Sequence, residues 1–118
     1  MSEKTLSFSL QRKEVPVTLD NEEYVIVELD GRERDKYLGT LGKRTRFDKD
    51  GKPAGLKDFD GIQASLLTLS LYKLGATGRE AVDAKTIQSW PSSVVSDLFD
   101  IAKDLSGIEV DEDEEGND

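Results

Sequence analysis

The sequence predicts an α+β fold with a mainly helical body, in which an N-terminal β-hairpin packs on about four helices. One observation is the stretch 59–74, the segment of this chain that is long and apolar enough to be the central helix of a core. Another is the period-2 alternation of apolar residues near the N-terminus. Finally, 118 residues with 36% hydrophobic and 35% charged side chains suit one small domain with a limited interior.

The apolar side chains of 59–74 form two stripes when they are placed at about 100° per residue. A surface helix needs one such stripe, so two stripes predict a helix that is buried on two sides. Its length of roughly sixteen residues and its polar interruptions argue against a membrane span. A turn over 75–80 is expected to follow. The first stripe contains Phe59, Ile62, Leu66 and Leu69, and the second contains Ala64, Leu67, Leu71 and Leu74.

The N-terminal third of the chain has the pattern of β-structure. Residues 15–19 alternate, 24–29 are rich in β-branched and aromatic side chains, and turn-forming residues separate them, so they predict a hairpin. Pro16 predicts that the first of these strands lies at a sheet edge. Residues 5–10 also alternate and are a candidate third strand. Their apolar side chains are Leu6, Phe8 and Leu10.

A helix over 31–41 is expected to follow the hairpin. Asp30 precedes it as an N-cap, and Glu33 three residues later completes a capping box. Residues 42–57 have no periodicity and contain several glycines and a proline. They predict a loop of unusual length for a compact domain, and such loops are typically mobile or functional.

Two more helices are predicted after the central helix. Asp83 is positioned to cap a short helix over 84–89. The last helix covers about 92–105, where apolar residues recur on one face. Ser92 is its expected N-cap and Gly107 its expected C-terminal stop.

The composition limits the chemistry that the chain can perform. It contains no cysteine and no histidine, which removes thiol catalysis, disulfides, the usual general base and the usual nitrogen ligand of metals. We therefore expect a protein that is not an enzyme and that binds no metal or cofactor. No apolar run follows Met1, so we expect a cytoplasmic protein without a signal peptide.

The formal net charge of −9 is concentrated at the C-terminal end. Seven of the 25 acidic residues lie in 109–118, which leaves 18 acidic and 16 basic residues in 1–108. We expect one globular domain over 1–108 and a disordered acidic tail over 109–118. A nearly neutral body argues against nucleic acid or a membrane surface as a partner.

Basic residues cluster in the expected loop 42–57. The candidate partner-binding residues are Lys43, Arg44, Arg46, Lys49 and Lys52, and such a cluster suits the acidic tail of a neighbouring copy. The alternative is a solvated loop, because Asp48 and Asp50 interleave with the cations. The cluster consists of Lys43, Arg44, Arg46, Lys49, Lys52 and Lys57.

Two further motifs are expected to be structural. Asp48 and Asp50 resemble the start of a calcium loop, but Lys52, Pro53 and Phe59 occupy positions where that loop needs other residues. A β-turn is therefore expected. Trp90 beside Pro91 is expected to fill the core rather than to bind a partner.

Several segments together carry a family resemblance that covers about residues 15–107. They are the hairpin, LDGRERDKYL at 29–38, GIQASLL at 61–67 and VSDLFDIAKDL at 95–105, followed by the acidic end. Their order and spacing resemble the tail assembly chaperones of long-tailed (siphovirus-type) bacteriophages or related prophages. The loop 42–57 is longer than that pattern, which leaves open an insertion with a binding role of its own.

The resemblance implies a non-catalytic protein that binds and solubilises the tape measure protein, a long helical polypeptide that sets tail length. It implies self-association, a location in the host bacterial cytoplasm and absence from the mature virion. The physical task is consistent with the sequence, since a small self-associating protein can cover the apolar stripes of a long amphipathic chain. The alternatives are a small structural or adaptor protein of the virion and an acidic host-directed inhibitor that mimics nucleic acid.

The resemblance also implies a longer form, made by programmed frameshifting near the end of the gene, through which the tail tube protein becomes a further partner. Glu115, Gly116 and Asn117 can be encoded GAG-GGA-AAC, which contains a heptanucleotide of the slippery form X-XXY-YYZ. These three residues are the candidate frameshift region.

Overall fold

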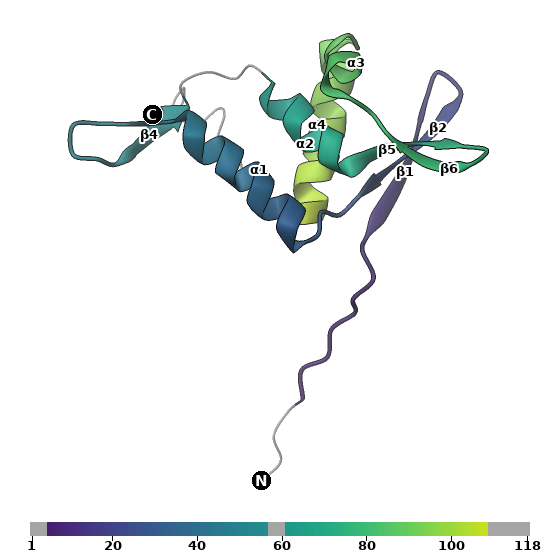
Figure 1. Ribbon diagram of the computed structural model, residues 1–118, viewed down its shortest axis with the longest axis horizontal. Helices are drawn as coiled ribbons and strands as arrows, with labels where there is room; N and C mark the ends of the chain where they lie inside the picture. Colours follow the sequence, from purple (N-terminus) through teal and green to yellow (C-terminus); the bar gives the residue numbers. More distant parts are fainter. Residues whose placement is uncertain (1–4, 57–60, 109–118) are drawn as a thin grey trace.

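The computed structural model describes residues 5–56 and 61–108, which form two antiparallel sheets and four α-helices (Figure 1). The strands are β1 (Glu14–Leu19), β2 (Glu22–Val27), β3 (Thr45–Phe47), β4 (Pro53–Leu56), β5 (Leu71–Gly75) and β6 (Gly78–Ala81). The helices are α1 (Gly31–Arg44), α2 (Ile62–Ser70), α3 (Ala84–Gln88) and α4 (Ser92–Ser106). One sheet has the order β1-β2-β5-β6, and the other pairs β3 with β4. The fold is α+β, as the sequence predicts.

The predicted N-terminal hairpin is confirmed as β1 and β2. Asp20 and Asn21 form its two-residue turn and both have positive φ, 50° and 69°. A turn of this kind matches the right-handed twist of the strands, and Asp and Asn tolerate this backbone conformation better than other side chains do. Pro16 lies on β1, an edge strand of the sheet, as expected.

The prediction of a third strand over 5–10 is wrong. In the described part of the chain no strand pairs with this segment, which runs extended away from the sheet (Figure 1). Pro16 supplies a reason. The carbonyl of Lys13 accepts a hydrogen bond from the Glu28 amide at 2.8 Å, and the alternation of an antiparallel ladder then turns the Pro16 backbone toward the free edge. That edge therefore lacks an N–H donor at its middle.

The capping box at the start of α1 is confirmed. Asp30 Oδ1 accepts from the Glu33 amide at 2.8 Å, and Glu33 Oε1 accepts from the Asp30 amide at 3.0 Å. The helix ends at Arg44, later than residue 41, and the Thr45 hydroxyl then donates to Leu41 O at 2.9 Å. Residues 42–57 are therefore not one long loop, because the last turn of α1 and the β3–β4 hairpin occupy most of them.

The central helix is shorter than the predicted 59–74. The helix α2 ends at Ser70, and Leu71 begins β5, which pairs with β2 so that Ile26 faces Leu71 and Tyr24 faces Lys73. Pairing with a distant strand thus overrides the helical periodicity of 71–74. Phe59 lies outside the described residues.

The segment 75–80, expected to be a turn, is in fact the end of a further hairpin, formed by β5 and β6. Only Ala76 and Thr77 form the turn, and β6 follows, with Gly75 paired with Gly78. The sequence of β6, GREA, contains no β-branched or aromatic residue, so its composition does not indicate a strand.

The four-stranded sheet curls so that its two edge strands approach each other. Arg79 on β6 forms an ion pair with Glu14 on β1 at 2.8 Å, although β2 and β5 lie between these strands in the sheet (Figure 1). The hydrogen bond from Arg79 to Glu14 raises the pKa of the Arg79 guanidinium. Both faces of β2 are buried, since Tyr24, Val25, Ile26 and Val27 are all covered.

Both apolar stripes of α2 face the core. Leu66 and Leu67 are each 0% exposed, which confirms that the helix is buried on more than one side. The helix packs against α1, α3 and α4. Tyr37 of α1 is also buried, and its hydroxyl donates to Ile62 O at 3.1 Å, which links α1 to the start of α2.

The two C-terminal helices follow the sequence prediction closely. Asp83 Oδ1 accepts from the Thr86 amide at 2.8 Å, and this bond lowers the pKa of the Asp83 carboxyl. Gly107 ends α4 with a φ of 64°, as expected of a C-terminal stop. The N-cap prediction is wrong, because Pro91 occupies that position and Ser92 is the first residue of the helix. The Pro91 carbonyl accepts from the amide of Val95 at 3.1 Å.

Among the described helices, none combines the length and the apolar character needed to cross a membrane. The expected acidic tail over 109–118, which includes Glu115, Gly116 and Asn117, lies outside the described residues, as does Lys57.

Candidate functional site

The β3–β4 hairpin and the last turn of α1 bring together the five predicted partner-binding residues. Lys43 and Arg44 end α1, Arg46 lies on β3, and Lys49 and Lys52 lie at the turn. The hairpin projects from the end of α1, on the side of the molecule away from the four-stranded sheet (Figure 1). We call residues 43–52 the basic hairpin.

The turn of the basic hairpin is organised by Asp48. Its Oδ1 atom accepts from the amide of Asp50 at 2.9 Å and from the amide of Lys52 at 3.0 Å. The Asp48 amide also donates to Lys52 O at 2.9 Å, and Gly51 has a φ of 80°. The Asp48 carboxylate is therefore bound to backbone donors, which is the β-turn that the sequence predicts. Within the ranges that the structure describes, no cluster of acidic, histidine or cysteine side chains is suited to hold a metal ion.

The surface of the basic hairpin is mixed, with an aromatic side chain among cations. Phe47 is 61% exposed, while Arg46 Nη2 donates across the hairpin to Ala54 O at 3.0 Å. Lys49 and Lys52 are exposed beside them. Such a surface can contact an apolar side chain through Phe47 and carboxylates through the neighbouring cations. The sequence indicated the cations, but the importance of Phe47 depends on its exposure and could not be predicted.

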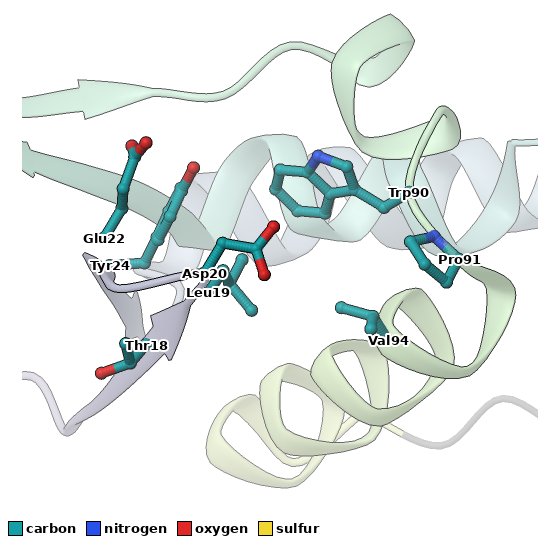
Figure 2. A pocket seen from close by; sticks show the side chains of 8 residues that line it. All are labelled: Thr18, Leu19, Asp20, Glu22, Tyr24, Trp90, Pro91 and Val94. Atoms are coloured by element: carbon teal, nitrogen blue, oxygen red, sulfur yellow. The ribbon is translucent and has the colours of Figure 1, made fainter.

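A second candidate site is a pocket of about 460 Å³ between the β1–β2 turn and the junction of α3 with α4 (Figure 2). Trp90 forms one wall, with its ring edge-to-face against Tyr24 at a centroid distance of 6.0 Å. Trp90 packs against the core and is only partly buried, so the expectation that it fills the core is incomplete. We call this the Trp90 pocket. It is lined by Thr18, Leu19, Asp20, Glu22, Tyr24, Trp90, Pro91 and Val94.

The Trp90 pocket has apolar walls and an acidic rim. Asp20 and Glu22 contribute the carboxylates, from the turn and from the first residue of β2 (Figure 2). Glu22 forms an ion pair with Lys73 of β5, and this hydrogen bond raises the pKa of the Lys73 ammonium group. The pocket therefore suits an apolar side chain flanked by hydrogen-bond donors.

Residues 5–13 form an extended segment, which we call the N-terminal arm. Its three large apolar side chains are exposed, with Leu6 at 76%, Phe8 at 83% and Leu10 at 98%. In the sequence, these side chains alternate with polar residues, and this pattern predicts a strand within the chain's own sheet. In the structure they face solvent instead.

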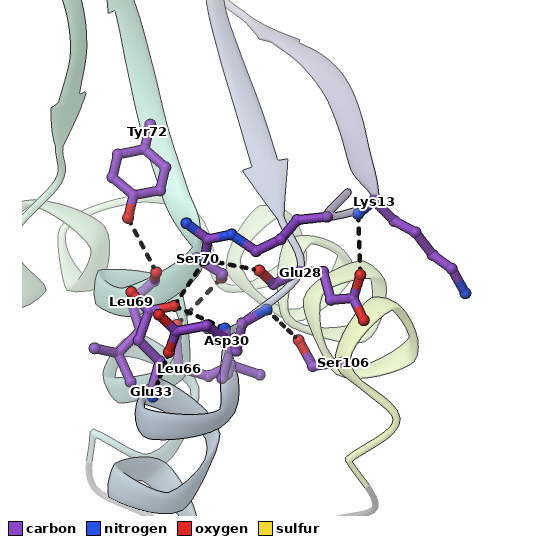
Figure 3. A network of polar contacts seen from close by, with 11 residues as sticks. Lys13, Glu28, Asp30, Glu33, Leu66, Leu69, Ser70, Tyr72 and Ser106 are labelled. Atoms are coloured by element: carbon purple, nitrogen blue, oxygen red, sulfur yellow. Dashed lines mark hydrogen bonds and ion pairs between the residues drawn. The ribbon is translucent and has the colours of Figure 1, made fainter. Parts of the chain in front are cut away.

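The base of the arm is held by polar contacts with the segment between β2 and α1 and with the first turn of α1. Arg12 Nη1 donates to Glu28 O at 3.1 Å and lies 3.0 Å from Glu33 Oε1. The Lys13 amide donates to Glu28 Oε1 at 3.0 Å (Figure 3). Nearby, the Leu29 amide donates to Ser106 Oγ at 3.0 Å, which joins this segment to the end of α4.

No protein-family model matches the sequence, and no curated protein and no solved structure matches the chain. Information on its function therefore comes from its own residues and their arrangement.

Proposed function

We propose that this protein is a tail assembly chaperone of a long-tailed bacteriophage, which binds helical segments of the tape measure protein and keeps them soluble in the host cytoplasm. The observation that supports this most is the basic hairpin, which projects from the body and presents exposed Phe47 among Arg46, Lys49 and Lys52. The sequence supports the proposal independently, because the hairpin, the helix starts and the core helix follow one another in an order that resembles this family.

The client of such a chaperone is a long amphipathic helix. Its apolar stripe aggregates unless another surface covers it. Phe47 provides apolar contact with the stripe, while Lys49 and Lys52 pair with carboxylates beside it. Exposed ion pairs contribute only about 0.2–1 kcal/mol each, so the contact is reversible. Reversibility is necessary, since tail tube subunits must displace the chaperone when they assemble around the client.

A long client is covered by many copies of a small protein. The body of this chain is nearly neutral, with 18 acidic and 16 basic residues in 1–108, so its copies do not strongly repel one another. Copies that contact each other along the client bind more tightly than isolated copies do, because each bound copy raises the local concentration of the next. We therefore include self-association in the proposed function.

Binding of a helical tape measure peptide by two variants tests the role of the basic hairpin. Phe47→Ser removes the aromatic contact, and Lys49→Glu combined with Lys52→Glu reverses the charge. Each variant is expected to weaken binding at least about tenfold, and the wild-type affinity is expected to fall with added salt. Lys85→Glu, a charge reversal at an exposed position of α3, is the matched control and should bind like the wild type.

Unchanged affinity in both hairpin variants would show that the basic hairpin is not the client-binding surface. Purified virions provide a separate check on the role itself. A chaperone should be absent from them, whereas a structural or adaptor protein should be detected by mass spectrometry.

A further inference from the structure

The N-terminal arm has the properties of a segment that binds another protein chain. Leu6, Phe8 and Leu10 alternate along an extended backbone, so their side chains share one side of it. Residues 5–11, TLSFSLQ, carry no charge. Exposed apolar side chains gathered in this way indicate an interaction surface, since isolated proteins rarely expose them together.

The contacts at the base of the arm set the direction in which it leaves the body. Arg12 is bound to Glu28 O and to Glu33, and the Lys13 amide is bound to the Glu28 carboxylate. These residues therefore continue the line of β1, and the arm extends away from the sheet (Figure 1). A return toward the body would need a turn at 11–13 and would break these contacts.

The arm does not fit the Trp90 pocket of its own chain. A turn over 11–13 would set Leu10 opposite Glu14, Phe8 opposite Pro16 and Leu6 opposite Thr18, by the pairing geometry of an antiparallel hairpin. Leu6 would then reach only Thr18 at the border of the pocket, and Phe8, opposite Pro16, would not reach Tyr24 and Trp90. The free edge of β1 also lacks a donor at Pro16. The apolar arm is thus available to a second copy.

The Trp90 pocket has the size and the chemistry to receive Phe8. Its volume of about 460 Å³ lies in the range of sites that enclose small organic groups. Leu19, Tyr24 and Trp90 provide apolar and aromatic walls, against which a third aromatic ring can pack edge-to-face or offset.

The charges of the two surfaces are also complementary. Residues 5–13 contain no acid, and of their two cations Arg12 is already paired with Glu33, so Lys13 is the cation that can contact a partner. The lining of the pocket contains two acids and no cation, and because Glu22 is paired with Lys73, Asp20 is the carboxylate that can contact the arm. Ser7 and Ser9 flank Phe8 in the sequence, and their hydroxyl groups can donate to a carboxylate at the rim. An arm that carried an acid beside Phe8 would instead be repelled.

We propose that the N-terminal arm of one copy binds the Trp90 pocket of a second copy, with Phe8 packed against the Tyr24–Trp90 aromatic pair. Each copy has one arm and one such pocket, so the contact either closes into a two-fold dimer or continues from copy to copy. This inference names the contact that underlies self-association. It stands on the arm and the pocket alone, and it therefore holds whether or not the client is a tape measure protein.

Disulfide cross-linking between two differently tagged versions of the chain tests the contact directly, because the natural sequence has no cysteine. One version carries Ser7→Cys, which leaves Phe8 in place, and the other carries Thr18→Cys in the pocket lining. After mixing and mild oxidation, the two versions are expected to form a cross-linked heterodimer. Pairing Ser7→Cys with Lys49→Cys at the basic hairpin is the control. No cross-link to Thr18→Cys, or an equal yield with Lys49→Cys, would overturn the proposal.

A second measurement uses an exposed side chain whose removal leaves the fold intact. Phe8→Ala is expected to lower the cross-linking yield at least about tenfold and to shift the sedimentation coefficient of the purified protein to that of a monomer. Its circular dichroism spectrum should stay that of the wild type, since Phe8 is 83% exposed within its own chain and is not part of the core. Association equal to that of the wild type would contradict the proposal. Neither measurement involves the client, so their failure is distinct from failure of the proposed function.

Discussion

Leu66 and Leu67 are neighbours in α2, yet both are fully buried, at 0% exposed. Adjacent residues of a helix point about 100° apart, so their burial requires packing partners on different sides of α2. The helices α1, α3 and α4 provide those partners. The stability of the fold therefore depends on both side chains.

Leu66→Ala and Leu67→Ala are each expected to lower the free energy of unfolding by about 2–5 kcal/mol, because each leaves a cavity in a packed core. Denaturant titration of the purified variants measures the change. Leu74→Ala is a control with the same chemistry at a side chain that is 37% exposed and lies outside the core cluster, and it should lower the unfolding midpoint less than either core variant. Midpoints that stay unchanged for both core variants would contradict this description of the core.

Residue-scale features that depend on near neighbours could be predicted from the sequence. The capping box of Asp30 and Glu33, the Asp83 cap and the Gly107 stop all form within a few residues of backbone. Ser92 was assigned as an N-cap on its residue type. Pro91 takes that position, because it precedes the helix and its carbonyl accepts the first helical hydrogen bonds.

Elements whose form depends on distant pairing were harder to predict. Residues 71–74 continue the helical pattern of α2, but the free edge of β2 pairs with them as β5. The strands β4 and β6 contain few residues that favour strands, and β3 has only three residues, so their turns and partners define them. The N-terminal arm shows the opposite case, in which the alternation predicts a strand that does not form. The edge of β1 beside it cannot pair regularly, because Pro16 lacks an N–H donor.

Deletion of 109–118 tests the proposed separation of the chain into a domain and an acidic tail. The segment contains Val110 as its only apolar side chain, so it cannot bury enough surface to offset the loss of chain entropy. The thermal midpoint of the truncated protein is expected to stay within a few degrees of that of the full chain, as measured by circular dichroism. A large decrease would indicate that the segment docks on the folded body.

At the scale of the whole molecule, the two proposed binding surfaces lie on different parts of the fold. The basic hairpin extends from the end of α1, whereas the Trp90 pocket is formed by the β1–β2 turn and the α3–α4 junction. This separation allows one copy to contact a client and a second copy at once. The sequence indicated the cations of the first surface, but the pocket joins residues from opposite ends of the chain and could not be read from local patterns.

The proposed longer form of the protein is tested first in the gene. A codon other than GGA at Gly116 would remove the slippery heptanucleotide over Glu115, Gly116 and Asn117. If the heptanucleotide is present, expression of the intact locus should give a larger product with the same N-terminus, detected by immunoblotting. Silent recoding of Gly116 should abolish that product while the shorter form continues to be made.

The most direct measurement of the proposed function is the solubility of the tape measure protein with and without this chain in the same cells. We expect co-expression to move the tape measure protein from the insoluble to the soluble fraction, because its apolar stripes are then covered. Phe47→Ser combined with Lys49→Glu and Lys52→Glu should lose much of this effect. A tape measure protein that is equally soluble in the absence of this chain would contradict the proposed chaperone function.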